Sequence, residues 1–272
     1  MVASIRPHQR SRLSERLRAL LTEAWLPLVL VVLWWVLSAR YPTTYSPALS
    51  EIVALFRKLW LFEHARTDLA PSLVNLAFGY SVALIVGVGL GTVLGLAPRL
   101  STALWPTLEF VRAIPGVALL PIFVILLGVG PSMKVTLIAV GAVWPILLNT
   151  IDGVRSVEPT LRDVAACFRI PLLTRLRYIV LPAAGPQIFS GARISLSIAV
   201  ILIVVSEMVG ANGGIGYFVR AAERSFAIPE MWSGIIMLGL LGYVLNTLFR
   251  IVEAHVLEWH HGMTSLGKRD RQ

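Results

Sequence analysis

The stretch PSLVNLAFGYSVALIVGVGLGTVLGLA, residues 71–97, is long, apolar and free of charged residues. About 20 such residues suffice for a helix to cross the ~30 Å hydrocarbon core of a bilayer. In lipid only helices and closed barrels satisfy their backbone polar groups, and barrel strands would instead appear as short alternating segments. The stretch therefore predicts a membrane helix and, with it, an all-α fold.

Small residues recur at every fourth position of this stretch, so they share one stripe of the predicted helix. Such a stripe lets another backbone approach closely, which is how membrane helices pack in the absence of a hydrophobic driving force. The alternative is that glycine is simply tolerated in a membrane helix. The glycine stripe consists of Gly79, Ala83, Gly87, Gly91 and Gly95.

The composition of the whole chain agrees with a membrane protein. Of its 272 residues 56% are hydrophobic and only 14% charged, with a mean hydropathy of +0.76, whereas about a quarter of a soluble chain is charged. The net charge of +9 is spread along the chain and not gathered with aromatic residues on one face, so we expect no nucleic-acid partner. A single cysteine, Cys167, excludes an intramolecular disulfide and a cysteine-rich metal site, and we expect no metal.

Six spans are expected, which makes the fold class a polytopic membrane helical bundle of six transmembrane helices. A basic segment, 1–23, precedes the transmembrane domain, 24–255, and a tail, 256–272, follows it. The basic N-terminus lacks a small-residue cleavage site, so the first apolar run is expected to stay as a membrane helix. The spans are expected at about 24–39, 71–97, 113–129, 135–151, 188–209 and 231–252.

The distribution of Lys and Arg predicts the orientation, because basic residues near span ends are retained on the cytoplasmic side. With both termini inside, cytoplasmic segments hold fourteen basic residues and outer segments seven. The polar segment 152–187 is then cytoplasmic, and the protein is a multi-pass membrane protein with both termini in the cytoplasm.

Within that segment, DVAACFRIPLLTRLRYIVLP, residues 163–182, reads as two short helices at an angle. Pro159 suits the first turn of a helix, and Pro171 ends it because the residue before a proline is pushed out of helical geometry. The second helix, 172–180, is expected to end at Pro182. Small residues around one aromatic side chain, Phe168, suit docking into a groove of a cytosolic partner. The alternative is an ordinary loop whose arginines only set topology or touch lipid headgroups.

The pattern resembles the EAA loop of permease subunits of binding-protein-dependent ABC importers, whose usual form is Glu-Ala-Ala, a Gly six residues after the Glu, and a Leu-Pro twelve residues later. Here Asp163 keeps the charge of the Glu, and Leu181-Pro182 has the right spacing, but Arg169 replaces the Gly. Either the turn is not left-handed, or Arg169 meets an acidic site on the partner. The resemblance implies that the ATPase-coupling residues are Asp163, Val164, Ala165, Ala166, Phe168, Arg169, Ile170 and Pro171.

Two further stretches, RAIPGVALLPIFVILLGVG from residue 112 and SEMVGANGGIGY from residue 206, are similar to permeases of the nitrate, sulfonate, taurine and bicarbonate branch. The resemblance spans about 25–260 and implies a type I ABC importer-like domain in the bacterial inner (plasma) membrane. It implies as partners a second copy of this chain, two cytosolic ATP-binding subunits and an extracytoplasmic solute-binding protein. The solute implied is a small organic or inorganic anion, such as a sulfonate, nitrate or an aromatic acid.

No nucleotide site is expected in the chain itself. Its three lysines, Lys58, Lys134 and Lys268, do not complete the glycine-rich loop ending in Gly-Lys-Ser/Thr that cradles phosphates. We therefore expect no catalytic residue and no cofactor in this chain, with ATP and Mg bound by the partner ATPase.

Pathway or gate candidates follow from charges and prolines in apolar surroundings. Charged residues inside membranes are costly and point to function, and prolines free carbonyls that are tolerated where helices are buried or line a cavity. Glu109 and Arg112 can pair on one helix face, or Arg112 can attract an anion. Glu207 can line the pathway or pair with a basic residue at the outer gate. The candidates are Glu109, Arg112, Pro115, Pro121, Glu207 and Asn212.

Two other classes of protein compete with this interpretation. An ATP-independent secondary transporter would carry inverted repeats and acidic residues near the membrane midplane, and Glu207 is peripheral. A non-transporting membrane anchor subunit would not need the spacing of the EAA-like loop. Uptake into vesicles with and without ATP separates the three.

Overall fold

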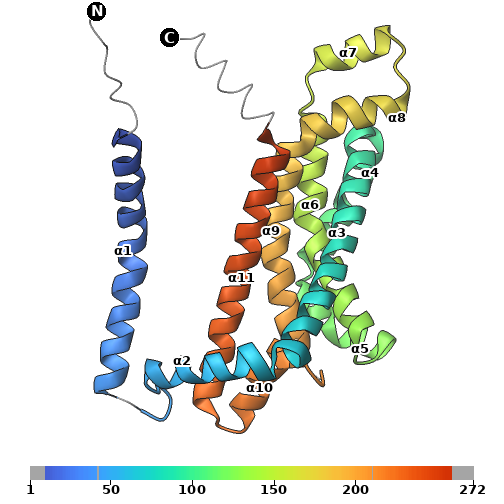
Figure 1. Ribbon diagram of the computed structural model, residues 1–272. Helices are drawn as coiled ribbons and strands as arrows, with labels where there is room; N and C mark the ends of the chain where they lie inside the picture. The colour runs from blue at the N-terminus through green and yellow to red at the C-terminus, as the bar shows by residue number, and fades with distance from the viewer. Residues whose placement is uncertain (1–9, 42, 210, 259–272) are drawn as a thin grey trace, which may run out of the picture.

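The computed structural model describes residues 10–41, 43–209 and 211–258, and these form helices joined by short connections (Figure 1). Within these residues no strand is present beyond an isolated bridge between Thr43 and Ser46. The elements are α1 (Arg10–Arg40), α2 (Leu49–Lys58), η1 (Leu59–Glu63), η2 (Ala65–Leu69), α3 (Ala70–Leu96), α4 (Pro98–Ala113), η3 (Gly116–Leu119), α5 (Leu120–Leu127), α6 (Pro131–Arg155), α7 (Pro159–Cys167), α8 (Leu172–Arg175), η4 (Leu176–Val180), α9 (Leu181–Met208), α10 (Ile215–Arg224) and α11 (Ile228–Val256).

Four helical runs among the described residues are long and apolar enough to cross a membrane: Ala65–Leu96, Pro131–Arg155, Leu172–Met208 and Ile228–Val256. The bent pair of α4 with η3 and α5 can supply a fifth crossing. The predicted first span corresponds to a shorter apolar helix, Trp25–Arg40. The all-α membrane fold is therefore confirmed, whereas the count of six full spans is met only if the bent pair and the short helix are included.

The bent pair consists of two helical runs, Pro98–Ala113 and Gly116–Leu127, and the predicted third span included only the second of them. We expected a crossing at 113–129, but α4 ends at Ala113 and the helical run 116–127 leaves it at 80°. Ile114 is extended (φ −73°, ψ 119°), as expected for a residue before proline. Pro121 lies in the first turn of α5, where a missing N–H costs nothing, so it begins a helix and does not interrupt one. The sequence analysis missed α4 entirely.

The segment 152–187 is also more helical than expected. The second short helix was predicted to end at Pro182, yet the chain runs as one helix from Leu172 to Met208. The π turn η4 precedes the proline, and Leu181 N–H bonds the Leu176 carbonyl across five residues. Such a π turn changes the hydrogen-bonding register locally, and Pro182 then falls in the first turn of α9. The helix of the predicted fifth span, 188–209, therefore starts inside the segment expected to be polar.

Three helices, α3, α6 and α9, pack together as the interior of the bundle, with a core that includes Leu76, Ile138, Ile146 and Ile203. The glycine stripe of α3 faces α6. A Cβ added to Gly91 would lie 2.6 Å from Thr150 Cβ, and one added to Gly95 would lie 2.7 Å from Val154 Cβ. At these two positions only a residue without a side chain allows this separation of the two helices.

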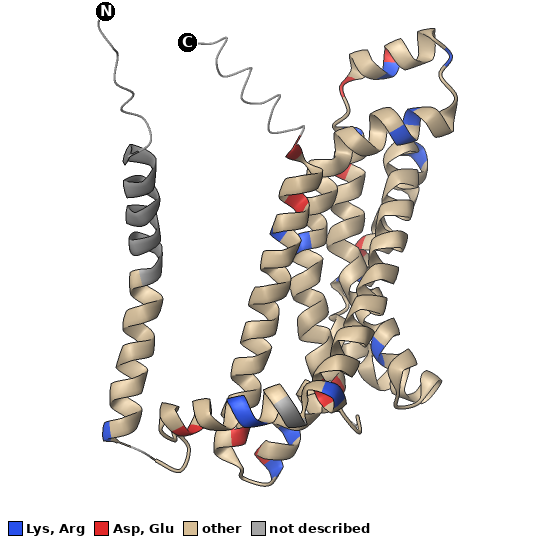
Figure 2. Ribbon diagram, viewed as in Figure 1, with Lys and Arg blue, Asp and Glu red and all other residues tan. Residues whose placement is uncertain are grey.

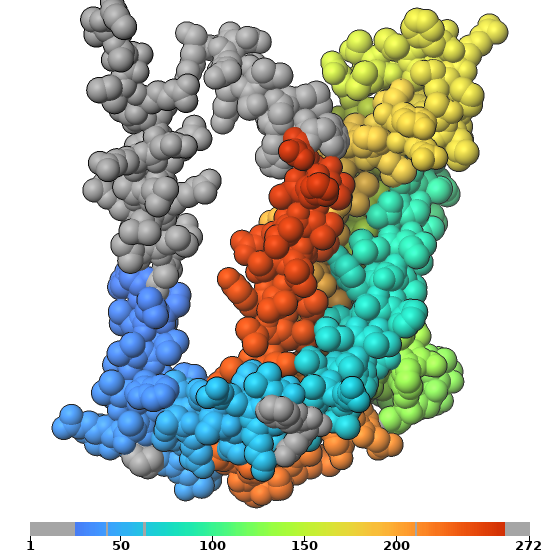
Figure 3. Space-filling view, in the orientation of Figure 1, coloured from blue at the N-terminus to red at the C-terminus, as the bar shows by residue number. Residues whose placement is uncertain are grey.

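The two ends of the bundle differ (Figure 1). At the end called here the α7 end, α7 and α8 project, α1 begins and α11 ends; at the opposite α10 end, α2 lies across the bundle beside α10. Figure 2 shows that Lys, Arg, Asp and Glu lie mostly toward these two ends, which leaves the middle of the helices apolar. A gap separates the apolar half of α1 from most of α11 (Figure 3), but the two helices meet at the α10 end, where the rings of Trp34 and Trp232 are 5.5 Å apart.

Candidate functional site

The α7 segment, residues 159–175, is a short helix closed by a tight left-handed turn. Ile170 N–H bonds the Ala165 carbonyl (3.0 Å) and Arg169 N–H bonds the Ala166 carbonyl (3.0 Å). This pair of bonds is the Schellman motif, which requires a left-handed residue after the helix, usually glycine. Arg169 adopts that conformation with φ 49°. Of the two alternatives for Arg169, the first is therefore excluded: the turn is left-handed although the residue is not glycine.

The α7 segment buries one small residue and exposes large ones. Ala165 is buried, whereas Phe168 is 78% exposed and Leu173 is equally open. Leu161 and Val164 continue this exposed apolar surface along α7. Large apolar side chains gathered on one face of a projecting element indicate an interaction surface. The remaining predicted coupling residues Asp163, Ala166, Arg169 and Pro171 are exposed, and Ile170 is half-buried.

Arginine contacts attach the α7 segment to the bundle. The Arg162 guanidinium donates to the carbonyls of Val154 (2.7 Å) and Arg155 (2.9 Å), which lie in the last turn of α6. The last carbonyls of a helix have no partner within it, so a cation placed there satisfies them and the helix dipole together. Arg155 in turn donates to Ser101 Oγ of α4 (2.6 Å). A displacement of α7 is therefore linked by hydrogen bonds to α6 and α4.

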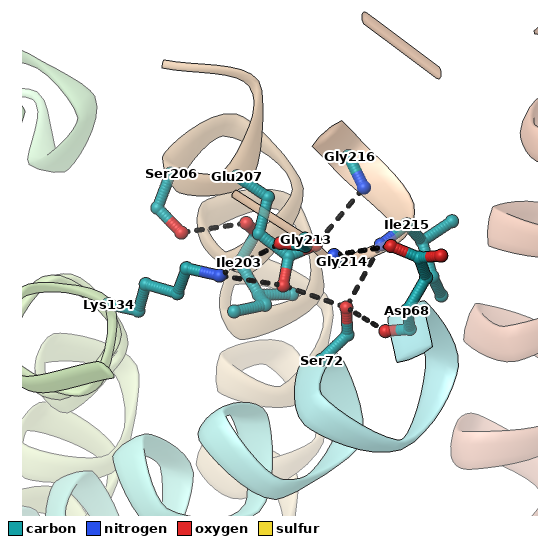
Figure 4. A network of polar contacts seen from close by, with 10 residues as sticks. All are labelled: Asp68, Ser72, Lys134, Ile203, Ser206, Glu207, Gly213, Gly214, Ile215 and Gly216. Carbon is teal, nitrogen blue, oxygen red and sulfur yellow. Dashed lines mark hydrogen bonds and ion pairs between the residues drawn. The ribbon is translucent and has the colours of Figure 1, made fainter. Parts of the chain in front are cut away.

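A second polar site, the Glu207 network, lies at the α10 end (Figure 4). Glu207 is 1% exposed, and its Oε1 accepts from Ser72 Oγ (2.7 Å) and from Lys134 Nζ (3.3 Å). Its Oε2 accepts from the Gly216 N–H (3.0 Å). Ser72 belongs to α3, Lys134 to α6 and Glu207 to α9, so one carboxylate joins the three interior helices. Burying a charge is tolerated only with this kind of pairing.

The network also holds the glycine-rich loop between α9 and α10. The Gly214 N–H donates to Asp68 Oδ1 (2.8 Å), the Ile215 N–H donates to Ser72 Oγ (3.1 Å), and Lys134 Nζ donates to the Gly213 carbonyl (3.3 Å). Gly214 has φ 115°, a conformation that other residues rarely adopt. These hydrogen bonds hold the loop in place and thereby fix the direction in which α10 begins.

Of the two alternatives for Glu207, the structure shows pairing with a basic residue, Lys134. Asn212 lies on the exposed part of the same loop and takes no part in the network. The sequence analysis missed Asp68, Ser72 and Lys134 as partners. A signal was present, because a carboxylate in a span requires a counter-charge, and Lys134 is the basic residue at the start of the fourth predicted span.

A cavity of about 440 Å³ lies where α4 breaks, between η3, α6 and α9. Pro115 and Gly116 form its wall at the break, and Trp144 and Asn149 of α6 face it. Arg112 stands at its edge and pairs with Glu109 (2.7 Å), so this predicted pair forms, with Arg112 48% exposed. The lining residues are Val111, Arg112, Ile114, Pro115, Gly116, Leu119, Val140, Gly141, Trp144, Pro145, Leu148, Asn149 and Ile198. Pro121 is not among them, and Trp144 and Asn149 were not predicted.

Together these features define a class: a multi-pass helical membrane protein with an exposed apolar segment at one end and a closed polar network at the other. The chain belongs to the family of binding-protein-dependent transport system inner membrane components, whose family model matches residues 67–258. It is a transmembrane permease of an ABC importer, in the branch that contains nitrate, sulfonate, taurine and bicarbonate permeases.

Individual relatives support this assignment. The chain is 30% identical over 238 residues to a Bacillus subtilis protein named as an aliphatic sulfonates transport permease, SsuC, covering 87% of this chain and 86% of that one. It is 32% identical to the nitrate import permease protein NrtB of Leptolyngbya laminosa, covering 70% and 68%. A chain of the MetNI methionine ABC transporter, solved in inward-facing conformations, has the same fold, with a TM-score of 0.59 at 21% identity over 74% of this chain and 97% of that one.

Proposed function

We propose that two copies of this chain form the translocation pathway of an ATP-driven importer in the bacterial inner membrane. Two cytosolic ATP-binding subunits, which hold ATP and Mg, bind the two α7 segments, and an extracytoplasmic solute-binding protein delivers the solute at the α10 end. The α7 end then faces the cytoplasm, so both termini are cytoplasmic. The relatives are named for an organic and an inorganic anion, and a small anion is the proposed solute.

The observation that carries this proposal is the exposed apolar surface around Phe168 on an element that is tied to the interior helices. A short helix that offers one aromatic side chain suits a groove on a partner. Because Arg162 binds the last turn of α6, a partner that moves α7 also moves α6. Helices on either side of the pathway can then swing as rigid units when the ATPases separate.

Crosslinking tests this coupling. In a Cys167→Ser background, Phe168→Cys should form a disulfide with a cysteine placed in the groove of the co-expressed ATPase subunit. The matched control is Tyr45→Cys, an equally exposed aromatic position at the α10 end, which should form none. Uptake into vesicles should require ATP. ATP-driven uptake by the Phe168→Cys variant without any crosslink, or crosslinks of equal yield at both positions, would contradict the proposed coupling.

The alternatives gain no specific support from the geometry. An ion-driven carrier would use an acidic residue near the midplane, whereas Glu207 is buried in a complete network at the α10 end. Uptake that persists without ATP would favour the carrier, and the absence of uptake under both conditions would favour a membrane anchor.

A further inference from the structure

We propose that the cavity at the α4 break is a transit site for a small organic anion with an apolar body, and that Arg112 and Trp144 recognise it. This inference rests on the proposed import function and specifies its solute class. Among the possible solutes, the site then favours organic anions over inorganic ones such as nitrate.

The position of the cavity favours a transit site. It lies beside residues 140–149, in the middle of the long helix α6. Another part of its wall is the non-helical link Ile114–Pro115, between α4 and η3. Non-helical backbone at membrane depth is tolerated where it is buried in protein or lines a cavity. The cavity therefore explains why an 80° break in the helix is tolerated at this position.

The lining determines which chemistry fits. All of the lining residues are apolar or glycine except Arg112 and Asn149, and no acidic residue is among them in the described part of the chain. A small inorganic anion needs several donors to replace its hydration, and such a wall supplies few. An organic anion can instead place its body against the aliphatic side chains and the Trp144 ring.

The guanidinium of Arg112 provides the anion contact. Its Nη2 pairs with Glu109, and its other N–H groups have no partner among the described residues. A guanidinium offers five donors in a planar fork that matches carboxylate and sulfonate oxygens. Arg112 can therefore keep its helix partner and still bind a headgroup at the cavity edge. The two alternatives for Arg112, pairing with Glu109 and attracting an anion, are therefore compatible in one geometry.

A protection experiment tests the site directly. Ile198 lines the cavity from α9, and the native Cys167 is exposed on α7. In the full chain with its ATPase subunits in nanodiscs, Ile198→Cys is exposed to sulfonatoethyl methanethiosulfonate, and peptide mass spectrometry follows modification at both cysteines. Benzenesulfonate should slow modification at position 198 at least about threefold and leave Cys167 unchanged. Nitrate should need a concentration at least about tenfold higher for the same protection.

Variants separate recognition from a general effect on folding. Arg112→Gln should abolish protection by benzenesulfonate, Arg112→Lys should retain part of it, and Trp144→Ala should weaken it. Protection by the neutral analogue benzyl alcohol should be the same in Arg112→Gln as in the parent, which reports an intact cavity.

Several outcomes would overturn the transit site. These are equal protection by nitrate and benzenesulfonate, protection that survives Arg112→Gln, and a cysteine at 198 that no reagent reaches. These outcomes are distinguishable from failure of the proposed function. ATP-dependent uptake without Arg112-dependent protection rejects the site alone. Protection without any Phe168 crosslink or ATP-dependent uptake rejects the importer and keeps the site.

Discussion

The packed interface of α3, α6 and α9 differs from the α7 segment in which side chains are buried and which are exposed. At the interface, polar groups are buried and paired, as in the Glu207 network, and glycines bring the helices into contact. In the α7 segment, apolar groups such as Phe168 are exposed, and a left-handed position is occupied by an arginine. The interface is complete within one chain, whereas the α7 segment offers a surface that lacks a partner in the described residues. Changes at the interface should therefore alter stability, and changes in the α7 segment should alter coupling.

The largest effect is expected from Glu207→Ala. Removing one partner of a buried ion pair leaves Lys134 buried without a counter-charge, which typically costs about 3–5 kcal/mol. Denaturant unfolding of the detergent-solubilised protein measures the loss. The control is Glu223→Ala, which breaks the exposed Glu223–Arg220 pair (2.7 Å) and should cost less than about 1 kcal/mol. Equal losses in the two variants would show that the network is not a structural element of the interface.

An intermediate effect is expected from Gly91→Ala in the glycine stripe. The added methyl would lie 2.6 Å from Thr150 Cβ and 2.8 Å from the Leu147 carbonyl, so α3 and α6 must separate, at a cost of about 1–3 kcal/mol. Gly89→Ala is a control on the same helix, because its Cβ meets nothing within 4 Å. Helix propensity then favours alanine by up to about 1 kcal/mol. The thermal unfolding midpoint should fall in Gly91→Ala and stay the same or rise in Gly89→Ala. A similar shift of the midpoint in both variants would refute the packing argument.

The smallest effect is expected from Arg169→Gly, a change toward the usual residue of the EAA loop. It removes about 1–2 kcal/mol of left-handed strain and costs about 0.5–1 kcal/mol of chain entropy. The turn should become more stable by about 0.5–1 kcal/mol, and hydrogen exchange should slow at the amides of positions 169 and 170, which close the turn.

Phe226→Gly provides the matched change at the α10 end, because Phe226 (φ 55°) closes α10 through the same pair of bonds. It should slow exchange of the Phe226 and Ala227 amides to a similar extent. If Arg169→Gly speeds exchange while Phe226→Gly slows it, the arginine side chain itself stabilises the α7 segment.

Features that depend on nearby residues were predictable from the sequence. Pro159 does begin α7, because proline restricts its own φ to a helical value. Pro171 was expected to end this helix, but α7 already ends at Cys167 in the left-handed turn of Arg169, and Pro171 instead precedes α8. The Glu109–Arg112 pair forms because residues three apart on a helix are neighbours. The prolines at 121 and 182 were misread for a related reason: a proline that breaks one helix and one that begins another look alike until the preceding turn is known.

What the sequence alone determined is that this chain crosses a membrane as helices and carries a short, bent helical segment between two of them. Apolar length and local proline effects suffice for that, since both act within a few turns of the chain. Only the tertiary structure decided that Glu207 meets Ser72, 135 positions away, and that the α4 break borders a cavity with Trp144. Such pairings depend on how α3, α6 and α9 pack, and close packing is decided by all their side chains together.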